Sequence, residues 1–171
     1  LTDQVFFKGD LDYLREISSQ VSIPTLAKDF IIDEKQIVRS RNAGATVILL
    51  IVAALPEARL KELYDFATGL GLEVLVETHN LAELEIAHRI GADIIGVNNR
   101  NLVTFETDLN TSLELSTHFK DQPVYISESA IFNGEDAALV APYFNGILVG
   151  TALMTAGDVA EKVKELQIDK G

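Results

Sequence analysis

Ile23-Pro-Thr-Leu-Ala-Lys-Asp-Phe30 is the stretch that decides the fold. The apolar run from Ile23 to Ala27 predicts a buried strand, and Lys28 and Asp29 follow at its carboxyl end. Continuously apolar strands are typical of parallel α/β sheets, which place their active sites at the carboxyl ends of the strands. Lys28 is therefore either a reacting group or the partner in a structural ion pair with Asp29 or a neighbour. The residues at the other strand ends decide between these alternatives.

Five further apolar runs follow along the chain. Helical periodicity succeeds each run, and the interval between runs is about one strand plus one helix. The runs are continuous rather than alternating, so they indicate βα units and a parallel sheet. These runs are Val47–Val52, Val74–Val76, Ile94–Val97, Val124–Ile126 and Ile147–Val149.

Capping residues mark where several helices begin. Asp33 with Gln36, and Asn80 with Glu83, each have the spacing of a capping box. Pro56 fits the first turn of the helix between them. Further helices are predicted over 10–20, 108–119, 133–143 and 158–167.

The composition bounds the class of protein. With 171 residues, 47% hydrophobic and 23% charged, we expect a single globular domain over 1–171. The net charge of −12 opposes nucleic-acid binding, and the longest apolar run, Val47–Leu55, is too short to span a bilayer. No signal peptide is visible. The absence of cysteine excludes disulfides, thiolate metal sites and cysteine nucleophiles, and it is compatible with a cytoplasmic enzyme.

The number of strands distinguishes two fold classes. A doubly wound sheet can hold six strands, but a glycine-rich phosphate loop normally follows its first strand, and this sequence has none. A (β/α)8 barrel has eight units and about 250 residues. Because the chain opens with the strand-like Leu1-Thr-Asp3 and then a helix, we expect an incomplete (β/α)8 TIM barrel with about six parallel strands.

Polar residues stand at the carboxyl end of nearly every run, and in a barrel these ends meet on one face. Lys28 and Glu77 supply a cation and a carboxylate that face each other, which suits general acid and base chemistry. Ala53-Ala54 is the apolar exception, and His79 is expected to be a solvated or ion-paired loop residue. The polar clusters are Lys28 and Asp29, Glu77 and His79, Asn98 to Arg100, Ser127 to Ser129, and Gly150 and Thr151.

The last two strand ends carry small residues. Ser129-Ala130 and Gly150-Thr151 allow backbone amides to approach a ligand closely. Loops at these positions of barrels frequently bind a phosphate. The pattern therefore indicates a phosphorylated small molecule as the ligand.

Six motifs together resemble the indole-3-glycerol phosphate synthase family, in the family's order and over essentially all 171 residues. The motifs are Pro24–Asp33, Val47–Leu55, Glu73–His79, Ile95–Leu102, Ser127–Ile131 and Leu148–Met154. The resemblance implies a carboxy-lyase of tryptophan biosynthesis. Its reaction closes the ring of 1-(2-carboxyphenylamino)-1-deoxyribulose 5-phosphate with loss of carbon dioxide and water. It has no redox step, so neither a cofactor nor a metal ion is expected.

The resemblance also implies roles for single residues. The lysine that matches Lys28 is the general acid of the condensation, the glutamate that matches Glu77 takes part in proton transfers of the dehydration, and Asn98 orients the reacting hydroxyl. The other implied contacts are Phe7, Phe30, Leu49, Ile51 and Leu102 around the anthranilate ring, Arg100, Glu128 and Ser129 in the substrate and anion shell, and Ser129, Ala130, Gly150 and Thr151 at the phosphate.

Two departures from the family pattern matter. Ser129-Ala130-Ile131 stands where the family usually has Ser-Gly-Ile, and alanine lacks glycine's freedom to adopt a positive φ, so we expect the phosphate loop to sit differently. The family's first two βα units, with a second catalytic lysine and a glutamate in a Lys-Lys-Ala-Ser-Pro-Ser motif, have no counterpart in these residues. We therefore expect these residues to turn over substrate weakly or not at all, and either to self-associate through the open barrel edges or to be poorly behaved in solution.

Two alternative functions stay open. Another phosphate-binding barrel, such as phosphoribosylanthranilate isomerase, would require a cysteine general base, which this sequence lacks. The other alternative is a non-catalytic barrel fragment whose only property is that it forms oligomers. Binding of the phosphorylated substrate or product near Lys28 and Thr151 would distinguish a competent site from an inert fragment.

Overall fold

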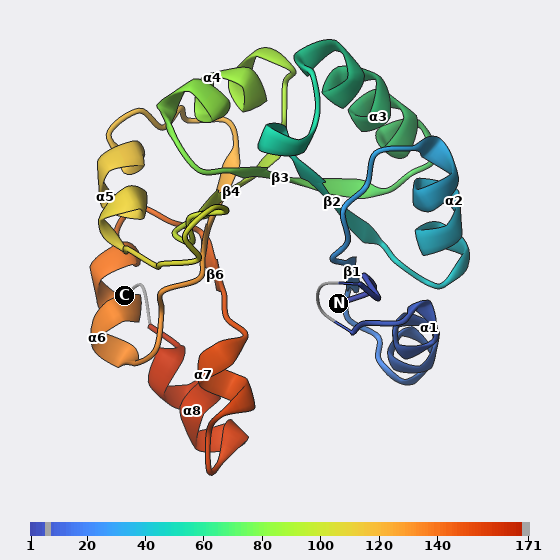
Figure 1. Ribbon diagram of the computed structural model, residues 1–171. Coiled ribbons are helices and arrows are strands. Elements are labelled where there is room, and N and C mark those ends of the chain that lie inside the picture. Colours follow the sequence, from blue (N-terminus) through green and yellow to red (C-terminus); the bar gives the residue numbers. More distant parts are fainter. Residues whose placement is uncertain (6–7, 169–171) are drawn as a thin grey trace. The chain divides into compact units, whose positions relative to one another are not determined.

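The computed structural model describes residues 1–5 and 8–168, in which strands and helices alternate (Figure 1). The strands are β1 (Leu26–Ala27), β2 (Val47–Ile51), β3 (Glu73–Thr78), β4 (Ile94–Asn98), β5 (Val124–Glu128) and β6 (Gly146–Leu148). The helices are α1 (Leu11–Gln20), α2 (Glu34–Asn42), the 3-10 turn η1 (Val52–Ala54), α3 (Glu57–Gly69), α4 (Leu81–Arg89), α5 (Asn110–Ser116), α6 (Gly134–Val140), α7 (Thr151–Met154) and α8 (Val159–Leu166).

The strands form one six-stranded sheet in the sequential order β1-β2-β3-β4-β5-β6. The pairs β1/β2, β2/β3 and β5/β6 are parallel and in continuous register. Sequential order with an intervening helix is the topology of a (β/α)8 barrel, whereas the strand order of a doubly wound sheet reverses at its switch point. The prediction of an incomplete barrel with six parallel strands is confirmed.

The chain divides into two compact units. The first unit comprises Leu1–Glu77 and Ile86–Ile94, and the second comprises Thr78–Glu85 and the residues from Ile95 onward. The expectation of a single domain stays a prediction. Among residues 1–5 and 8–168, no helix combines the length and the apolar character that crossing a bilayer requires.

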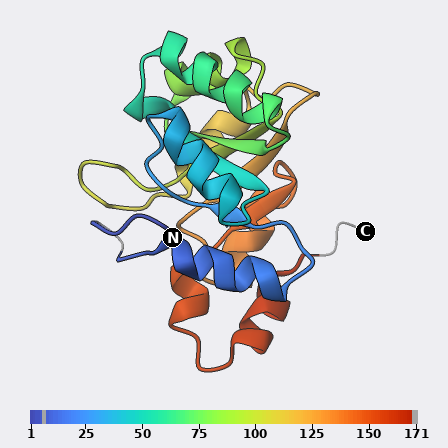
Figure 2. The same cartoon turned by 90° about the vertical axis from the view of Figure 1, so that its right-hand side faces the viewer.

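The core of the first unit lies between β2 and the helices that follow it. Figures 1 and 2 show α2 beside α3 on one side of β2. Ile48 and Leu50 of β2, Ile37 of α2, and Leu60 and Leu63 of α3 are all completely buried. Burial of such side chains is worth about 1.5–3 kcal/mol each. The apolar runs of the sequence therefore form buried strands in the structure, as their composition predicts.

The first predicted strand is much shorter than the apolar run that suggested it. Only Leu26–Ala27 pair with β2, and Ile23 is 71% exposed. Pro24 has no N–H to give to a sheet. Thr25 is held by a side chain instead, because its N–H donates to Thr46 Oγ1 at 2.9 Å. The prediction of a strand from Ile23 was wrong for these reasons.

The capping residues were predicted with mixed success. The capping box of Asp33 and Gln36 is complete. The second box is only half formed: Glu83 N donates to Asn80 Oδ1 at 3.0 Å, but Glu83 Oε2 accepts from the backbone N–H of His79 at 2.8 Å. Pro56 precedes α3 as its N-cap residue instead of lying in the first turn.

An ion pair joins α2 to α3. Arg59 Nη1 and Nη2 donate to the two carboxylate oxygens of Glu34, each at 2.6 Å. This bidentate bond lowers the pKa of Glu34 from its ordinary 4.5 to about 2. Because the pKa is lower in the folded chain, the pair stabilises the fold above pH 4.5, and this contribution is lost as the pH falls from 4.5 towards 2.

Replacement of Arg59 by glutamine should return the Glu34 carboxyl to its ordinary pKa near 4.5. The measurement is an NMR titration of the Glu34 side-chain carbon in the folded protein. Glu62→Gln is the matched control, because it removes only the 3.1 Å contact of Glu62 with Arg59 and should leave Glu34 titrating near 2. A wild-type midpoint near 4.5 would contradict the bidentate pair.

Candidate active site

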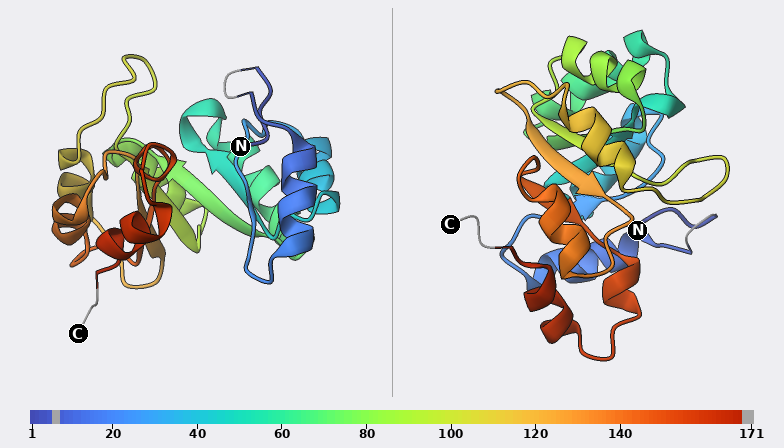
Figure 3. Two further views of the ribbon diagram at one scale, coloured as in Figure 1. Left: turned by 90° about the horizontal axis from the view of Figure 1, so that it is seen from below. Right: turned by 90° about the vertical axis from the view of Figure 1, so that its left-hand side faces the viewer.

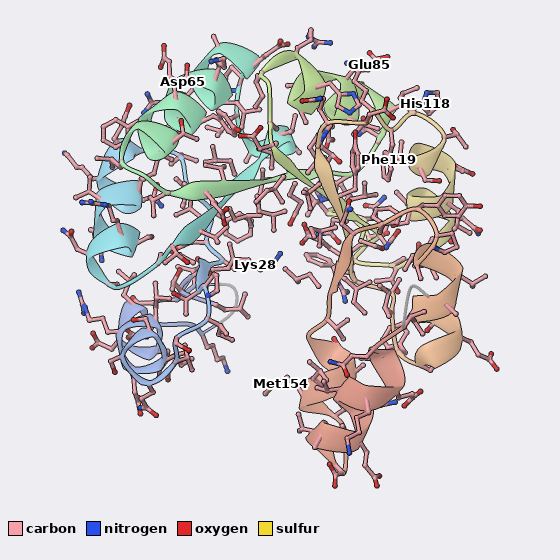
Figure 4. All side chains as sticks on the ribbon, turned by 180° about the vertical axis from the view of Figure 1, so that it is seen from behind. Lys28, Asp65, Glu85, His118, Phe119 and Met154 are labelled. Atoms are coloured by element: carbon pink, nitrogen blue, oxygen red, sulfur yellow. The ribbon has the colours of Figure 1, made fainter. Side chains whose placement is uncertain are left out.

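Lys28 and Glu77 face each other in the first unit. Lys28 directly follows β1, and its Nζ donates to Oε2 of Glu77 in β3 at 3.3 Å. The Glu77 side chain is only 3% exposed, whereas the Lys28 side chain is 27% exposed. A carboxylate that is so far removed from water needs a nearby cation, and Lys28 supplies it. Figure 4 labels Lys28 at the end of β1. The pair thus combines a buried proton acceptor with a donor that solvent still reaches.

Asp29, the alternative partner of Lys28, is engaged elsewhere. Asp29 accepts hydrogen bonds from Thr2 Oγ1 at 2.9 Å and from Phe30 N at 2.8 Å. Thr2 also donates its backbone N–H to Lys28 O at 3.1 Å. The segment Leu1-Thr-Asp3 is not a strand, contrary to expectation, but through Thr2 it fixes the backbone from which Lys28 projects.

Two of the predicted apolar site residues share a sheet face with Glu77. The register pairs Ile51 with Glu77 and Leu49 with Leu75, and register partners on adjacent strands point to the same face. Leu49 and Ile51 are 2% and 5% exposed. Phe30 is 36% exposed, two residues after Lys28. Phe7 lies outside the described residues. The first unit therefore brings Leu49 and Ile51 to the same face as the Lys28–Glu77 pair.

In the second unit, β4 ends at Asn98 and Asn99 follows directly, and the two asparagines have different partners. Asn98 is 9% exposed, and its Oδ1 accepts from Arg100 N at 3.0 Å. Asn99 is 2% exposed, and its side chain bonds to the end of β5 and to the start of α5. Glu128, the last residue of β5, is completely buried. The polar strand ends predicted for this half of the chain are thus built into its interior.

Arg100 lies in a long loop between β4 and α5, which projects from the second unit (Figure 3). Its backbone pairs with Thr107 in an antiparallel bridge, and its Nη1 donates to Phe105 O at 2.9 Å. Leu102, in the same loop, is 40% exposed. The guanidinium of Arg100 thus bonds within its own loop, and the predicted anion and ring contacts of Arg100 and Leu102 stay predictions.

Ser129 and Ala130 both have positive φ, +64° and +60° respectively. Alanine therefore adopts here the conformation for which it lacks glycine's freedom, and the expected difference of the phosphate loop from that of the family stays a prediction. An alanine held there costs about 1–2 kcal/mol, which the surrounding structure must offset. The Ser129 N–H donates to Leu148 O of β6 at 3.3 Å, so this N–H is already engaged in a hydrogen bond with the neighbouring strand.

The helix α7 was not predicted, because four residues are too few to show helical periodicity. Gly150 is its N-cap residue, and Gly150 O accepts from Leu153 N at 3.1 Å and from Met154 N at 3.0 Å. The N–H groups of the first turn of a helix have no partner within that helix. Gly150 and Thr151 therefore present their amides at the start of a helical turn.

His79 lies beside a carboxylate, and the expectation that it is a solvated or ion-paired loop residue stays a prediction. Its side chain is 11% exposed, and its Nδ1 lies 2.9 Å from Glu83 Oε2. Among the described residues, no group of three or more histidine, aspartate or glutamate side chains is arranged to hold a metal ion.

Comparison with known proteins gives the same family as the motifs. A sequence profile described as indole-3-glycerol phosphate synthase matches residues 1–166. Proteins with this name from Streptococcus thermophilus, Streptococcus mutans and Streptococcus sanguinis are 90%, 85% and 84% identical to the chain over 171 residues. Each match covers the whole chain and 67% of the relative's length.

Solved structures support the fold separately. A 3-hexulose-6-phosphate synthase from Salmonella typhimurium superimposes with a TM-score of 0.80 at 15% identity. The superposition covers 93% of this chain and 79% of that protein. At this level of identity the likeness concerns the fold alone.

Replacement of Ala130 by glycine should stabilise the protein by about 1 kcal/mol, because glycine adopts a positive φ without strain. The measurement is urea unfolding of the two proteins side by side. Ala137→Gly is the control, because Ala137 lies in the right-handed helix α6 and glycine should destabilise it by about 1 kcal/mol. Equal destabilisation by both substitutions would contradict the left-handed conformation of Ala130.

Proposed function

Because this chain belongs to the indole-3-glycerol phosphate synthase family, we propose that its residues carry the proton-transfer and phosphate-binding groups of that reaction. Members of the family are carboxy-lyases of tryptophan biosynthesis. The observation that carries the proposal is the 3.3 Å contact between Lys28 and the buried Glu77. A proton donor and a proton acceptor at the carboxyl ends of parallel strands are the groups that this chemistry needs.

Lys28 acts as the general acid of the condensation. Ring closure joins an aromatic carbon to the keto carbon of the substrate, and the keto oxygen must gain a proton as this bond forms. The Lys28 ammonium group can deliver that proton, because 27% of its side chain stays exposed while Glu77 fixes its direction. Loss of carbon dioxide then restores the aromatic ring.

Glu77 takes part in the dehydration that follows. The hydroxyl formed from the keto oxygen leaves as water, which requires a proton on that oxygen and removal of one from the ring system. A buried carboxylate next to an ammonium group can accept and return a proton without exchanging it with bulk water. Asn98 orients the reacting hydroxyl.

The remaining roles concern binding. We assign the anthranilate ring to apolar side chains and the phosphate to backbone amides, because neither group needs a reactive partner. The ring residues are Phe7, Phe30, Leu49, Ile51 and Leu102, the substrate and anion shell comprises Arg100, Glu128 and Ser129, and the phosphate residues are Ser129, Ala130, Gly150 and Thr151.

The 171 residues by themselves should turn over substrate weakly or not at all. They span 67% of the length of their relatives, and the family's first-strand lysine and glutamate have no counterpart among them. We also propose that the isolated polypeptide self-associates, because within residues 1–5 and 8–168 β1 and β6 each have a neighbouring strand on one side only. The absence of a nucleic-acid partner and a cytoplasmic location stay predictions from charge and composition.

Lys28→Gln and Glu77→Gln should each lower kcat about 100-fold or more, because each removes one of the proposed proton-transfer groups. The assay is indole fluorescence of the product. It uses a full-length chimera, in which the part of the Streptococcus thermophilus relative outside the 171-residue match is joined to this chain.

Matched controls separate this loss from a general effect of charge removal. Lys35 and Glu73 are exposed residues of α2 and β3, and Lys35→Gln and Glu73→Gln should retain kcat within about 2-fold. Circular dichroism confirms that each variant is folded. Full activity of folded Lys28→Gln or Glu77→Gln would refute the assignment of that residue. A 171-residue polypeptide as active as the chimera would refute its proposed impairment.

Analytical ultracentrifugation tests the proposed self-association. At micromolar concentration the 171-residue polypeptide should sediment as an oligomer. The chimera should show no association through β1 and β6. A well-folded monomer of the isolated polypeptide would rule out the proposal.

A further inference from the structure

Asn99 is a buried amide to which the proposed chemistry gives no task. It directly follows β4 and is 2% exposed. Its neighbours Ser112 and Ser127 are completely buried, and their hydroxyl oxygens lie 2.8 Å apart. An asparagine buried so deeply must satisfy both ends of its amide, so its partners reveal what it holds in place.

The donor end of Asn99 bonds to two successive carbonyl groups at the end of β5. Nδ2 lies 3.0 Å from Glu128 O and 3.2 Å from Ser129 O, and it is also 3.1 Å from Ser127 Oγ. The backbone N–H of Asn99 donates to Glu128 O as well, at 2.8 Å. One residue therefore supplies hydrogen bonds to both peptide units at which β5 ends.

Two successive carbonyls can reach one nitrogen only if the chain leaves the extended conformation. In a strand, successive carbonyl groups point in opposite directions. Here Glu128 O and Ser129 O converge on the same Nδ2, and the residue between these carbonyls, Ser129, has φ +64°. The hydrogen bonds of Asn99 thus require a turn at Ser129, and the structure forms that turn with Ser129 at positive φ.

The acceptor end of Asn99 fixes which way the amide points. Oδ1 accepts from the backbone N–H of Ser112 at 2.9 Å, near the start of α5. A flipped amide would set its oxygen against two carbonyls and its NH2 against an N–H group. An aspartate would likewise place an oxygen against Glu128 O and Ser129 O. Asparagine offers both the NH2 donor and the oxygen acceptor that these partners require.

We propose that Asn99 is a positioning residue that holds Ser129 in the left-handed conformation and so directs the next peptide unit, which carries the Ala130 amide, toward the substrate's phosphate. The ligand in this statement rests on the proposed function, but the conformation does not. The hydrogen bonds of Asn99 offset part of the strain of a non-glycine residue held at positive φ.

The test compares Asn99→Ala with Ser112→Ala in the full-length chimera. Ser112→Ala removes a hydroxyl from the same buried cluster but keeps the N–H that bonds to Asn99 Oδ1, so it is the matched control. The first readout is the NOE between the amide proton and the Hα of Ser129, which is strong only at positive φ. The second readout is the affinity for inorganic phosphate, titrated on the Ala130 amide signal.

We expect Asn99→Ala to lose the strong NOE and to weaken phosphate binding about tenfold, while Ser112→Ala keeps the NOE and binds phosphate within about twofold of the wild type. If Asn99→Ala keeps the NOE, Asn99 is merely structural and the proposal is overturned. If Asn99→Ala does not fold, the near-isosteric Asn99→Asp decides by the same readout, with loss of the NOE supporting the proposal and its retention overturning it.

The two readouts separate this inference from the proposed function. A wild-type chimera that does not shift the Ala130 amide on addition of phosphate argues against the phosphate role of the turn, whatever Asn99 does. Loss of the NOE in Asn99→Ala with unchanged phosphate affinity supports the positioning role and moves the phosphate site elsewhere.

Discussion

The first unit depends on one electrostatic constraint: the carboxylate of Glu77 is almost fully buried, so a cation must lie beside it. Lys28 meets that requirement from a strand of only two residues, and so short a strand cannot fix the direction of a long side chain alone. Thr2 bonds to Lys28 O and to Asp29, and Thr46 bonds to Thr25 N just before the strand. These contacts hold the backbone around Lys28. The local structure therefore supports the Lys28–Glu77 pair on which the proposed chemistry depends.

The second unit also buries polar groups at the ends of its strands. Asn99 bonds to the end of β5 and to α5 at once. Directly after β5 the backbone turns, with two non-glycine residues at positive φ. A buried amide that holds a backbone turn suits a site that binds its ligand through backbone N–H groups. A buried carboxylate beside an ammonium group suits a site that transfers protons.

Much of this architecture follows from the sequence. Continuous apolar runs locate β2 to β6 to within about two residues, because burial on both faces leaves no polar residue in the body of a parallel strand. The pairing of Lys28 with Glu77 follows from strand-end position. Features that depend on competition between hydrogen-bond partners do not follow from the sequence. Glu83 bonds to the His79 N–H instead of completing its capping box, and Ser129 and Ala130 adopt a positive φ at the turn to which Asn99 bonds.

A double-mutant cycle between Lys28 and Glu77 tests most directly whether they act as one proton-transfer pair. The quantity is kcat of the full-length chimera carrying Lys28→Gln, Glu77→Gln, or both. Residues that act as a unit are strongly non-additive, so the double variant should lose about as much activity as the worse single variant. If the losses multiply, the double variant is slower by the product of the two single effects. That result would show that the two side chains act independently, and it would contradict a single proton-transfer pair.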